Sequence, residues 1–163
     1  MKMTLRPLLL VALAAGFSAL VLGSARAGGS HFFPPVSEPL VREECGSCHL
    51  AFAPSMLPAA SWRQMMGELD RHFGEDATVD PEIARKITAW LVANAGDSGG
   101  SRYGAKLLRG VDAGAAPQRI TGLPKWVREH REVPDWEWRH KEVRSKANCV
   151  ACHADAERGY YED

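Results

Sequence analysis

Apolar residues recur at helical spacing over a stretch in the first half of the chain. The apolar positions of this stretch are Trp62, Met66, Leu69 and Phe73. A period of about 3.6 residues predicts a helix, and the flanking residues predict that it begins with Ser61 as N-cap and ends at Gly74. His72 follows Met65 and Leu69 at helical intervals, so it is expected on the apolar face of this helix.

A second helix is predicted from its start signal. Asp80-Pro81-Glu82 offers an N-cap carboxylate followed by proline at the first helical position. The apolar stripe that follows consists of Ile83, Ile87, Trp90 and Leu91. Gly96 is the predicted end of this helix.

Shorter helices are expected at 41–49, 103–111, 123–130 and 141–153, with proline-rich turns and loops between them. The chain shows no strand-rich alternation of apolar and polar residues. The pattern therefore predicts an all-α fold with long loops and little or no β structure.

The first 27 residues have the three-part layout of a secretory signal peptide. Lys2 and Arg6 precede an almost uniformly apolar run at 7–23, and the sequence ARA at 25–27 resembles a cleavage site. A transmembrane anchor is the alternative, because about 17 apolar residues are close to the minimum for a span. The small-residue site and the loop-like GGSHFFPP favour cleavage, so we expect a periplasmic protein without stable membrane insertion.

The charges give no indication of nucleic-acid binding. Cleavage removes three of the 20 basic residues and none of the 20 acidic ones, which leaves 17 against 20 and a formal charge of −3. The basic residues alternate with acids, as in KWVREHREV and WRHKEVRSK. Such mixed runs are typical of solvated faces.

All four cysteines belong to two copies of one motif. Residues 45–49 read CGSCH and residues 149–153 read CVACH. C-x-x-C-H is the signature of c-type haem attachment: two thiols bond the vinyl groups of one haem edge, and the adjacent histidine becomes the proximal iron ligand. The motifs predict two haems c, held by Cys45, Cys48 and His49, and by Cys149, Cys152 and His153.

Other uses of the cysteines explain the pattern less well. Two disulfides, one within each motif, would close short loops that stabilise little and would leave the following histidines unexplained. A Cys₄ zinc site also leaves the histidines unused. A redox dithiol is expected within a βαβ unit, which the pattern does not predict.

The remaining coordination position of each iron decides the function. A filled position favours electron transfer, whereas an open one permits ligand binding or peroxide chemistry. His72, on its apolar face, and His130, one turn after Trp126, are favoured as the distal ligands. From proximity in sequence, His72 is assigned to the first haem and His130 to the second.

Three other side chains stay open as ligands. His140 lies among charged residues and is expected to face solvent, and His31 lies in the N-terminal segment. Met56, in a loop flanked by prolines, is the most credible methionine ligand. Trp62, Trp90 and Trp126 are expected to pack against the haems.

Three blocks of sequence resemble the dihaem cytochrome c family. They read EECGSCHLAFAPSMLPAASWRQMMGELDRHFGEDATVD, RITGLPKWVREHREV and SKANCVACHADAERGYYED. The resemblance runs from about Glu38 to the C-terminus, and the blocks follow the family's order. It implies two bis-histidine haems with His72 and His130 as distal ligands, in two small haem-bearing parts packed together.

The resemblance also implies function and partners. Family members are exported electron carriers that exchange electrons with other haem proteins, including a small oxygen-binding cytochrome and membrane b-type cytochromes. We therefore expect a monomeric periplasmic electron-transfer protein and not an enzyme. The alternatives are a dihaem peroxidase-like enzyme, or a haem-based redox or gas sensor, with one open iron site. The expected organisation is a signal peptide at 1–27, haem-binding parts at 28–96 and 119–163, and a linker at 97–118.

Overall fold

The computed structural model describes residues 31–162. The predicted signal peptide at 1–27 lies outside the described residues. Within 31–162 all regular structure is helical; there is no strand, and only two isolated bridges, Phe32 with Tyr160 and His72 with Glu75. The predicted all-α fold is confirmed. No helix in this part of the chain is long and apolar enough to cross a membrane.

Six α-helices carry most of the regular structure of the described part. They are α1 (Pro39–Gly46), α2 (Ala59–Gly67), α3 (Pro81–Ala93), α4 (Arg102–Leu107), α5 (Pro124–Glu129) and α6 (Asp135–Trp138). Short 3₁₀ turns lie between and after them at Pro54–Met56, Leu69–Arg71, Ile120–Gly122, Cys149–Ala151 and Ala156–Arg158.

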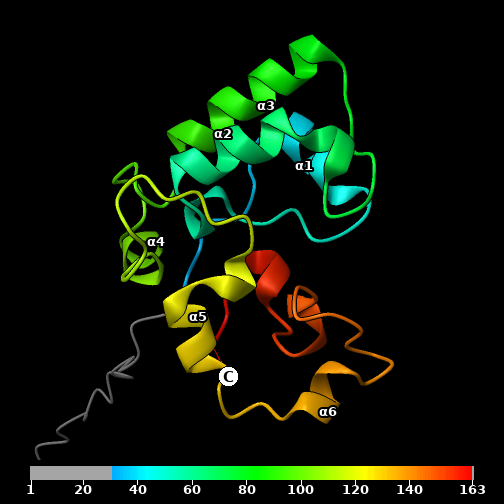
Figure 1. Cartoon of the computed structure of the whole chain (residues 1–163), viewed down its shortest axis with the longest axis vertical. Helices are drawn as coiled ribbons and strands as arrows, with labels where there is room; N and C mark the ends of the chain where they lie inside the picture. Colours follow the sequence, from blue (N-terminus) through cyan, green and yellow to red (C-terminus); the bar gives the residue numbers. More distant parts are fainter. Residues whose placement is uncertain (1–30, 163) are drawn as a thin grey trace, which may run out of the picture.

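The helices form two unequal groups. Helices α1, α2 and α3 lie together, whereas α5, α6 and the C-terminal segment form the other end of the molecule (Figure 1). Buried side chains of the first group include Val41 from α1, Trp62 from α2, and Ile87 and Leu91 from α3. The segment expected as a linker contains α4, whose Leu107 is buried in the same core.

The N-terminal segment of the described chain pairs with the C-terminal tail. The backbone N–H of Phe33 donates to the carbonyl of Gly159 at 2.9 Å, and the backbone N–H of Tyr161 donates to the carbonyl of His31 at 3.2 Å. Gly159 has φ +86°, and a Cβ there would lie 2.1 Å from the carbonyl oxygen of Phe33. Only glycine allows this close approach, which holds the aromatic tail against the fold.

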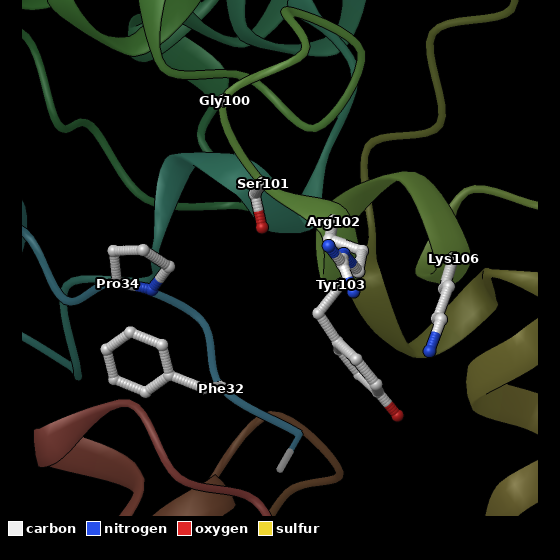
Figure 2. Close-up of a pocket in the computed structure, with 7 residues that line it drawn as sticks. All are labelled: Phe32, Pro34, Gly100, Ser101, Arg102, Tyr103 and Lys106. Carbon is white, nitrogen blue, oxygen red and sulfur yellow. The ribbon is translucent and has the colours of Figure 1, made fainter. Parts of the chain in front are cut away.

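A cavity of about 350 Å³ lies between this N-terminal segment and α4. Figure 2 shows Phe32 on one wall and Tyr103 and Lys106, both from α4, on the other. Its lining consists of Phe32, Pro34, Gly100, Ser101, Arg102, Tyr103 and Lys106. None of the predicted haem-binding residues lines it.

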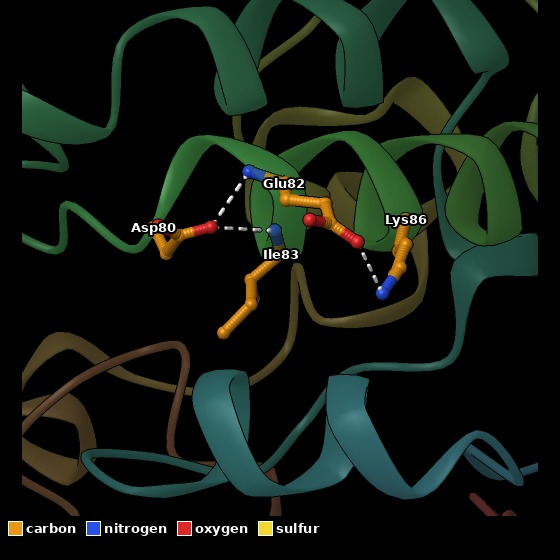
Figure 3. A network of polar contacts seen from close by, with 4 residues as sticks. All are labelled: Asp80, Glu82, Ile83 and Lys86. Atoms are coloured by element: carbon orange, nitrogen blue, oxygen red, sulfur yellow. Dashed lines mark hydrogen bonds and ion pairs between the residues drawn. The ribbon is translucent and has the colours of Figure 1, made fainter.

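The predicted start of α3 is confirmed. The Asp80 carboxylate accepts hydrogen bonds from the backbone N–H groups of Glu82 at 2.8 Å and Ile83 at 3.3 Å (Figure 3). Pro81 fits the first helical position because its missing N–H would have no helical partner there. Glu82 and Lys86 form an exposed ion pair at 2.8 Å one turn on. The helix ends at Ala93, shortly before the predicted Gly96.

The predicted helix from Ser61 to Gly74 is wrong at both ends. Helix α2 begins at Ala59 after Pro58, and Ser61 is buried inside it rather than capping it. The reason lies far along the chain: the Asp97 carboxylate accepts from the N–H of Ala59 at 2.8 Å. Helix α2 ends at Gly67, so His72 is not on an α-helix but follows the 3₁₀ turn Leu69–Arg71.

The predicted helix at 141–153 is also wrong. The chain makes successive turns there, and Arg144 has φ +62°, which an α-helix does not accept. The Asn148 side chain donates to the carbonyls of Glu142 and Val143 at 3.3 and 3.0 Å, which folds the segment back on itself. Helix α6, at 135–138, was not predicted, because it is a single turn without a clear apolar stripe.

Candidate haem centres

The first CxxCH motif begins in the last turn of α1. Cys45 belongs to the helix and is half-buried, whereas Cys48 and His49 follow it and are exposed. The His49 Nδ1 lies 2.8 Å from the carbonyl oxygen of Leu50. A carbonyl can only accept, so Nδ1 carries the proton and donates. The Nε2 atom of His49 therefore keeps its lone pair for a metal.

A tight turn presents His72 to this motif. The N–H of Glu75 donates to the His72 carbonyl at 3.1 Å, and the two central residues have positive φ, +52° at Phe73 and +105° at Gly74. Such a turn requires a residue like glycine at its second central position. The ring centroids of His49 and His72 lie 6.1 Å apart, and the ring planes differ by 18°.

The second motif lies on a 3₁₀ turn, Cys149–Ala151, rather than at the end of an α-helix. The N–H of His153 donates to the Cys149 carbonyl at 2.8 Å, so the motif closes on itself. On the side of His153, the ring of Tyr161 lies 5.7 Å away between centroids. The C-terminal tail, which pairs with the N-terminal segment, thus places Tyr161 beside the second motif.

His130 caps the C-terminal end of α5 and faces the second motif. Its Nδ1 donates to the carbonyl of Trp126 at 2.9 Å, which leaves Nε2 free as at His49. The Trp126 ring stacks on His130 at 4.1 Å, and Trp138 lies 6.0 Å away. The centroids of His130 and His153 are 6.1 Å apart, with ring planes at 80°.

The spacing of both histidine pairs fits one metal ion between the rings. A metal–imidazole bond is about 2.0–2.1 Å, and bond lengths near 1.33 Å put a ring nitrogen about 1.15 Å from its centroid. Two imidazoles on opposite sides of one ion therefore have centroids about 6.3 Å apart. The observed 6.1 Å for His49 with His72, and for His130 with His153, agrees with this value.

Apolar side chains beside both pairs fit a large planar group. Phe73, next to His72, is 49 % exposed, and Val150, inside the second motif, is 41 % exposed. Phe52 lies 5.2 Å from the ring of His49. A covering macrocycle would remove these side chains from water, where large apolar residues are costly. The residues present therefore fit two haems.

The thiols do not fit the competing uses. Burial, and then the charge of Glu44, raise the pKa of Cys45, and burial raises the pKa of Cys149 to about 11. Redox-active dithiols have lowered values instead. Within residues 31–162, no three histidine, cysteine, aspartate or glutamate side chains gather as metal ligands, so the two motifs do not converge on one zinc ion.

Burial lowers the pKa of His72, and the neighbouring His49 lowers it further. A lowered pKa favours the neutral imidazole, which is the form that binds a metal. The lowered pKa of His72 and the 6.1 Å spacing of its ring from that of His49 both favour His72 as a metal ligand.

The other candidate ligands lie apart from the histidine pairs. His140 is exposed, and its Nδ1 accepts from the N–H of Glu142 at 3.3 Å within a local turn. Met56 is buried in the core, at 3 % exposed. His31 packs on Tyr103 with ring centroids 4.5 Å apart. The structure brings none of them into a pair with His49 or His153.

Of the three tryptophans expected near haems, only Trp126 contacts a candidate ligand. Trp62 is buried, and its indole N–H donates to the carbonyl of Pro54 at 2.8 Å. Trp90 packs against the apolar core. Sequence reasoning did not single out Phe52, Trp138 or Tyr161, whose placement depends on distant parts of the chain.

A family comparison decides the identity of the chain. A profile described as "Dihaem cytochrome c" matches residues 41–161, which include both motifs and both candidate distal histidines. The chain belongs to the dihaem cytochrome c family. Comparison with curated protein sequences gives no match.

Solved structures of dihaem cytochromes c agree with this assignment. A dihaem cytochrome c from Rhodobacter sphaeroides is 43 % identical, with a TM-score of 0.71 over 78 % of this chain and 98 % of that one. A second structure from this organism gives 41 % identity and a TM-score of 0.64 over 77 % and 98 %. The dihaem cytochrome from Shewanella baltica is 32 % identical, with a TM-score of 0.61 over 76 % and 86 %.

Membership confirms the predicted cofactors, two c-type haems with their irons. It also supports a haem c electron carrier. As a dihaem cytochrome c, the chain has two attachment motifs on unlike supports: an α-helical end for the first and a 3₁₀ turn for the second.

Proposed function

We propose that this dihaem cytochrome c is a periplasmic electron carrier in which each haem iron is held between two histidines. His49 and His72 are the ligands of the first haem, and His153 and His130 those of the second. The observation that carries this proposal is the 6.1 Å separation of the rings in both pairs. When bound, haem iron supplies reversible one-electron chemistry, and bis-histidine ligation favours a low potential relative to methionine.

The protein residues hold the ligands in one geometry. The carbonyls of Leu50 and Trp126 fix the tautomers of His49 and His130 through their Nδ1 protons. The four cysteines anchor the macrocycles covalently. A ligand set that is held in place needs little rearrangement when the charge of the iron changes, which favours fast electron transfer.

A carrier explains the site better than an enzyme does. A peroxidase-like enzyme, or a gas sensor, needs an open iron position, whereas the rings of His72 and His130 lie 6.1 Å from those of His49 and His153, which supports two filled positions. Export follows from the predicted signal peptide, and we propose that the protein acts as a monomer. Its proposed partners are other haem proteins, either a soluble oxygen-binding cytochrome or a membrane b-type cytochrome.

Replacement of the distal histidines tests the ligation. In His72→Ala and in His130→Ala, one haem should become high-spin, visible in the absorption spectrum, and should bind carbon monoxide after reduction. His140→Ala is the matched control, because His140 is exposed and bonds only within its own turn. A fully low-spin spectrum in His72→Ala would exclude His72 as a ligand.

A further inference from the structure

The two haem sites differ in the charged residues beside them in the sequence, although each also has charges of the other sign. Arg119 lies 4.2 Å from the Phe73 ring at the first, and Asp155 and Glu157 follow the second motif. At the first, Glu43 and Glu44 directly precede Cys45, and the turn that carries His72 is followed by Glu75 and Asp76. Close before the second motif, the segment 139–146 contains four basic residues and one acidic residue. The basic residues are Arg139, Lys141, Arg144 and Lys146.

The basic side chains of 139–146 face solvent. The Lys141 side chain is 84 % exposed, and its Nζ lies 3.8 Å from a carboxylate oxygen of the adjacent Glu142, which is also exposed. Arg139, Arg144 and Lys146 are exposed, and among the described residues none of the three forms an ion pair. An exposed positive field of this kind attracts acidic partners over distances of about a Debye length, roughly 8–10 Å.

An exposed tryptophan lies beside this segment. Trp136 in α6 is 62 % exposed, the highest value among the large apolar side chains of the described part. Trp138, two residues later, packs near His130. Residues two apart on a helix do not share a face, so Trp136 and Trp138 lie on different faces of α6. Tryptophan and arginine are the residues most enriched at the energetic centres of protein interfaces.

Contacts connect this surface to the second haem site. The Nζ of Lys146 lies 5.5 Å from the ring centroid of Trp138, and that ring lies 6.0 Å from His130. A protein bound to Trp136 and the basic segment would therefore be close to the second haem. Short separation between redox centres is what electron exchange needs.

We propose that Trp136 and the basic segment 139–146 form a docking surface for an acidic one-electron redox protein. Trp136 is the apolar anchor, and Arg139, Lys141, Arg144 and Lys146 attract and orient the partner. This inference rests on the proposed electron-carrier function.

Charge reversal at the surface tests the proposal. Binding of the holoprotein to an acidic flavodoxin is measured by titration at low and at high salt. Arg139→Glu with Lys141→Glu should weaken binding at low salt about tenfold or more. The matched control, Arg63→Glu with Arg85→Glu, makes the same change in net charge at exposed positions of α2 and α3, and should have a clearly smaller effect.

Further variants separate docking from folding. Trp136→Ala should weaken flavodoxin binding at least about fivefold and leave the haem spectra unchanged. If the charge-reversed variant loses a haem, the titration is repeated with the neutral variant Arg139→Gln with Lys141→Gln. A smaller loss of affinity for flavodoxin is expected for this variant. A carbodiimide cross-link between Lys141 and a flavodoxin carboxylate, identified by mass spectrometry, would place the partner directly.

Three outcomes would overturn the proposal. In the first, the control variant weakens binding as much as the surface variant does. In the second, a basic mitochondrial-type cytochrome binds as tightly as flavodoxin. In the third, only phosphatidylglycerol vesicles bind through Arg139 and Lys141. Reduction of every variant by dithionite, which needs no docking, checks the carrier function separately from the docking surface.

Discussion

The same CxxCH motif lies on two different kinds of secondary structure in this molecule. The first motif ends helix α1, beside a core that includes the fully buried Ile87. The second lies on a 3₁₀ turn, where Tyr161 contacts His153 and where Trp126 and Trp138 contact the facing His130. The comparison shows that the attachment motif does not depend on one kind of secondary structure. Because most of the buried apolar core belongs to the first region, we expect the second region to depend more on its haem.

Loss of one attachment motif should give the largest effect. Cys149→Ser with Cys152→Ser removes the covalent bonds to the second haem, and the region around α5 and α6 has few buried side chains outside the main core, such as Val143 and Ala156. We expect one haem per chain by the pyridine haemochrome assay, and loss of amide hydrogen-exchange protection throughout that region.

The matched variant, Cys45→Ser with Cys48→Ser, should also carry one haem but keep protection in α2 and α3. These helices pack on each other through apolar side chains without the cofactor. Equal loss of protection in the two variants would contradict the difference between the regions.

Truncation of a core side chain should have the next largest effect. Ile87 in α3 is 1 % exposed, and Ile87→Ala is expected to lower the free energy of unfolding by about 2–5 kcal/mol. Val143→Ala removes a smaller buried side chain from the second region, and a smaller loss is expected. Chemical denaturation of the holoproteins measures both. A larger loss for Val143→Ala would show that the second region has the denser core.

Removal of a helix cap should have a smaller effect. Asp80→Ala deprives the N–H groups of Glu82 and Ile83 of their acceptor, and should cost about 1 kcal/mol. Asp135→Ala is the control in the second region, because Asp135 makes no side-chain cap bond in α6. It should change the free energy of unfolding little, and equal costs would mean that capping does not distinguish the two regions.

The smallest difference concerns only the orientation of the proposed ligand rings. The rings of the first pair are nearly parallel, at 18°, and those of the second nearly perpendicular, at 80°. Perpendicular imidazoles leave two iron orbitals close in energy, which increases the anisotropy of a low-spin ferric centre. The oxidised protein should therefore give two distinct low-spin electron paramagnetic resonance signals. His72→Ala should remove the less anisotropic one; loss of the other would reverse the assignment.

The sequence predicted the features that depend on neighbouring residues. The start of α3 follows from Asp80 and Pro81, and the attachment residues follow from motifs of five residues. His72 was singled out from helical spacing, yet it lies in a turn formed by Phe73 and Gly74. The spacing of apolar residues predicted the buried position of Trp62, but Phe73 is 49 % exposed and the helix ends before His72.

Features that depend on distant residues could not be predicted. Helix α2 starts early because Asp97, 38 residues away, accepts from Ala59. Tyr161 reaches the second site because Gly159 pairs with Phe33 across nearly the whole described chain. No local pattern around Ala59 or Tyr161 reports these contacts, so they appear only once the chain is folded.

In the proposed ligation, a histidine fills the remaining position of both irons. Carbon monoxide binds ferrous haem readily only where a position is open or its ligand is easily displaced, so the most direct test is the absorption spectrum of the reduced holoprotein before and after the gas is added. With His72 and His130 in place, we predict no change at neutral pH. A carbon monoxide spectrum at either haem would contradict bis-histidine ligation and identify an open iron site.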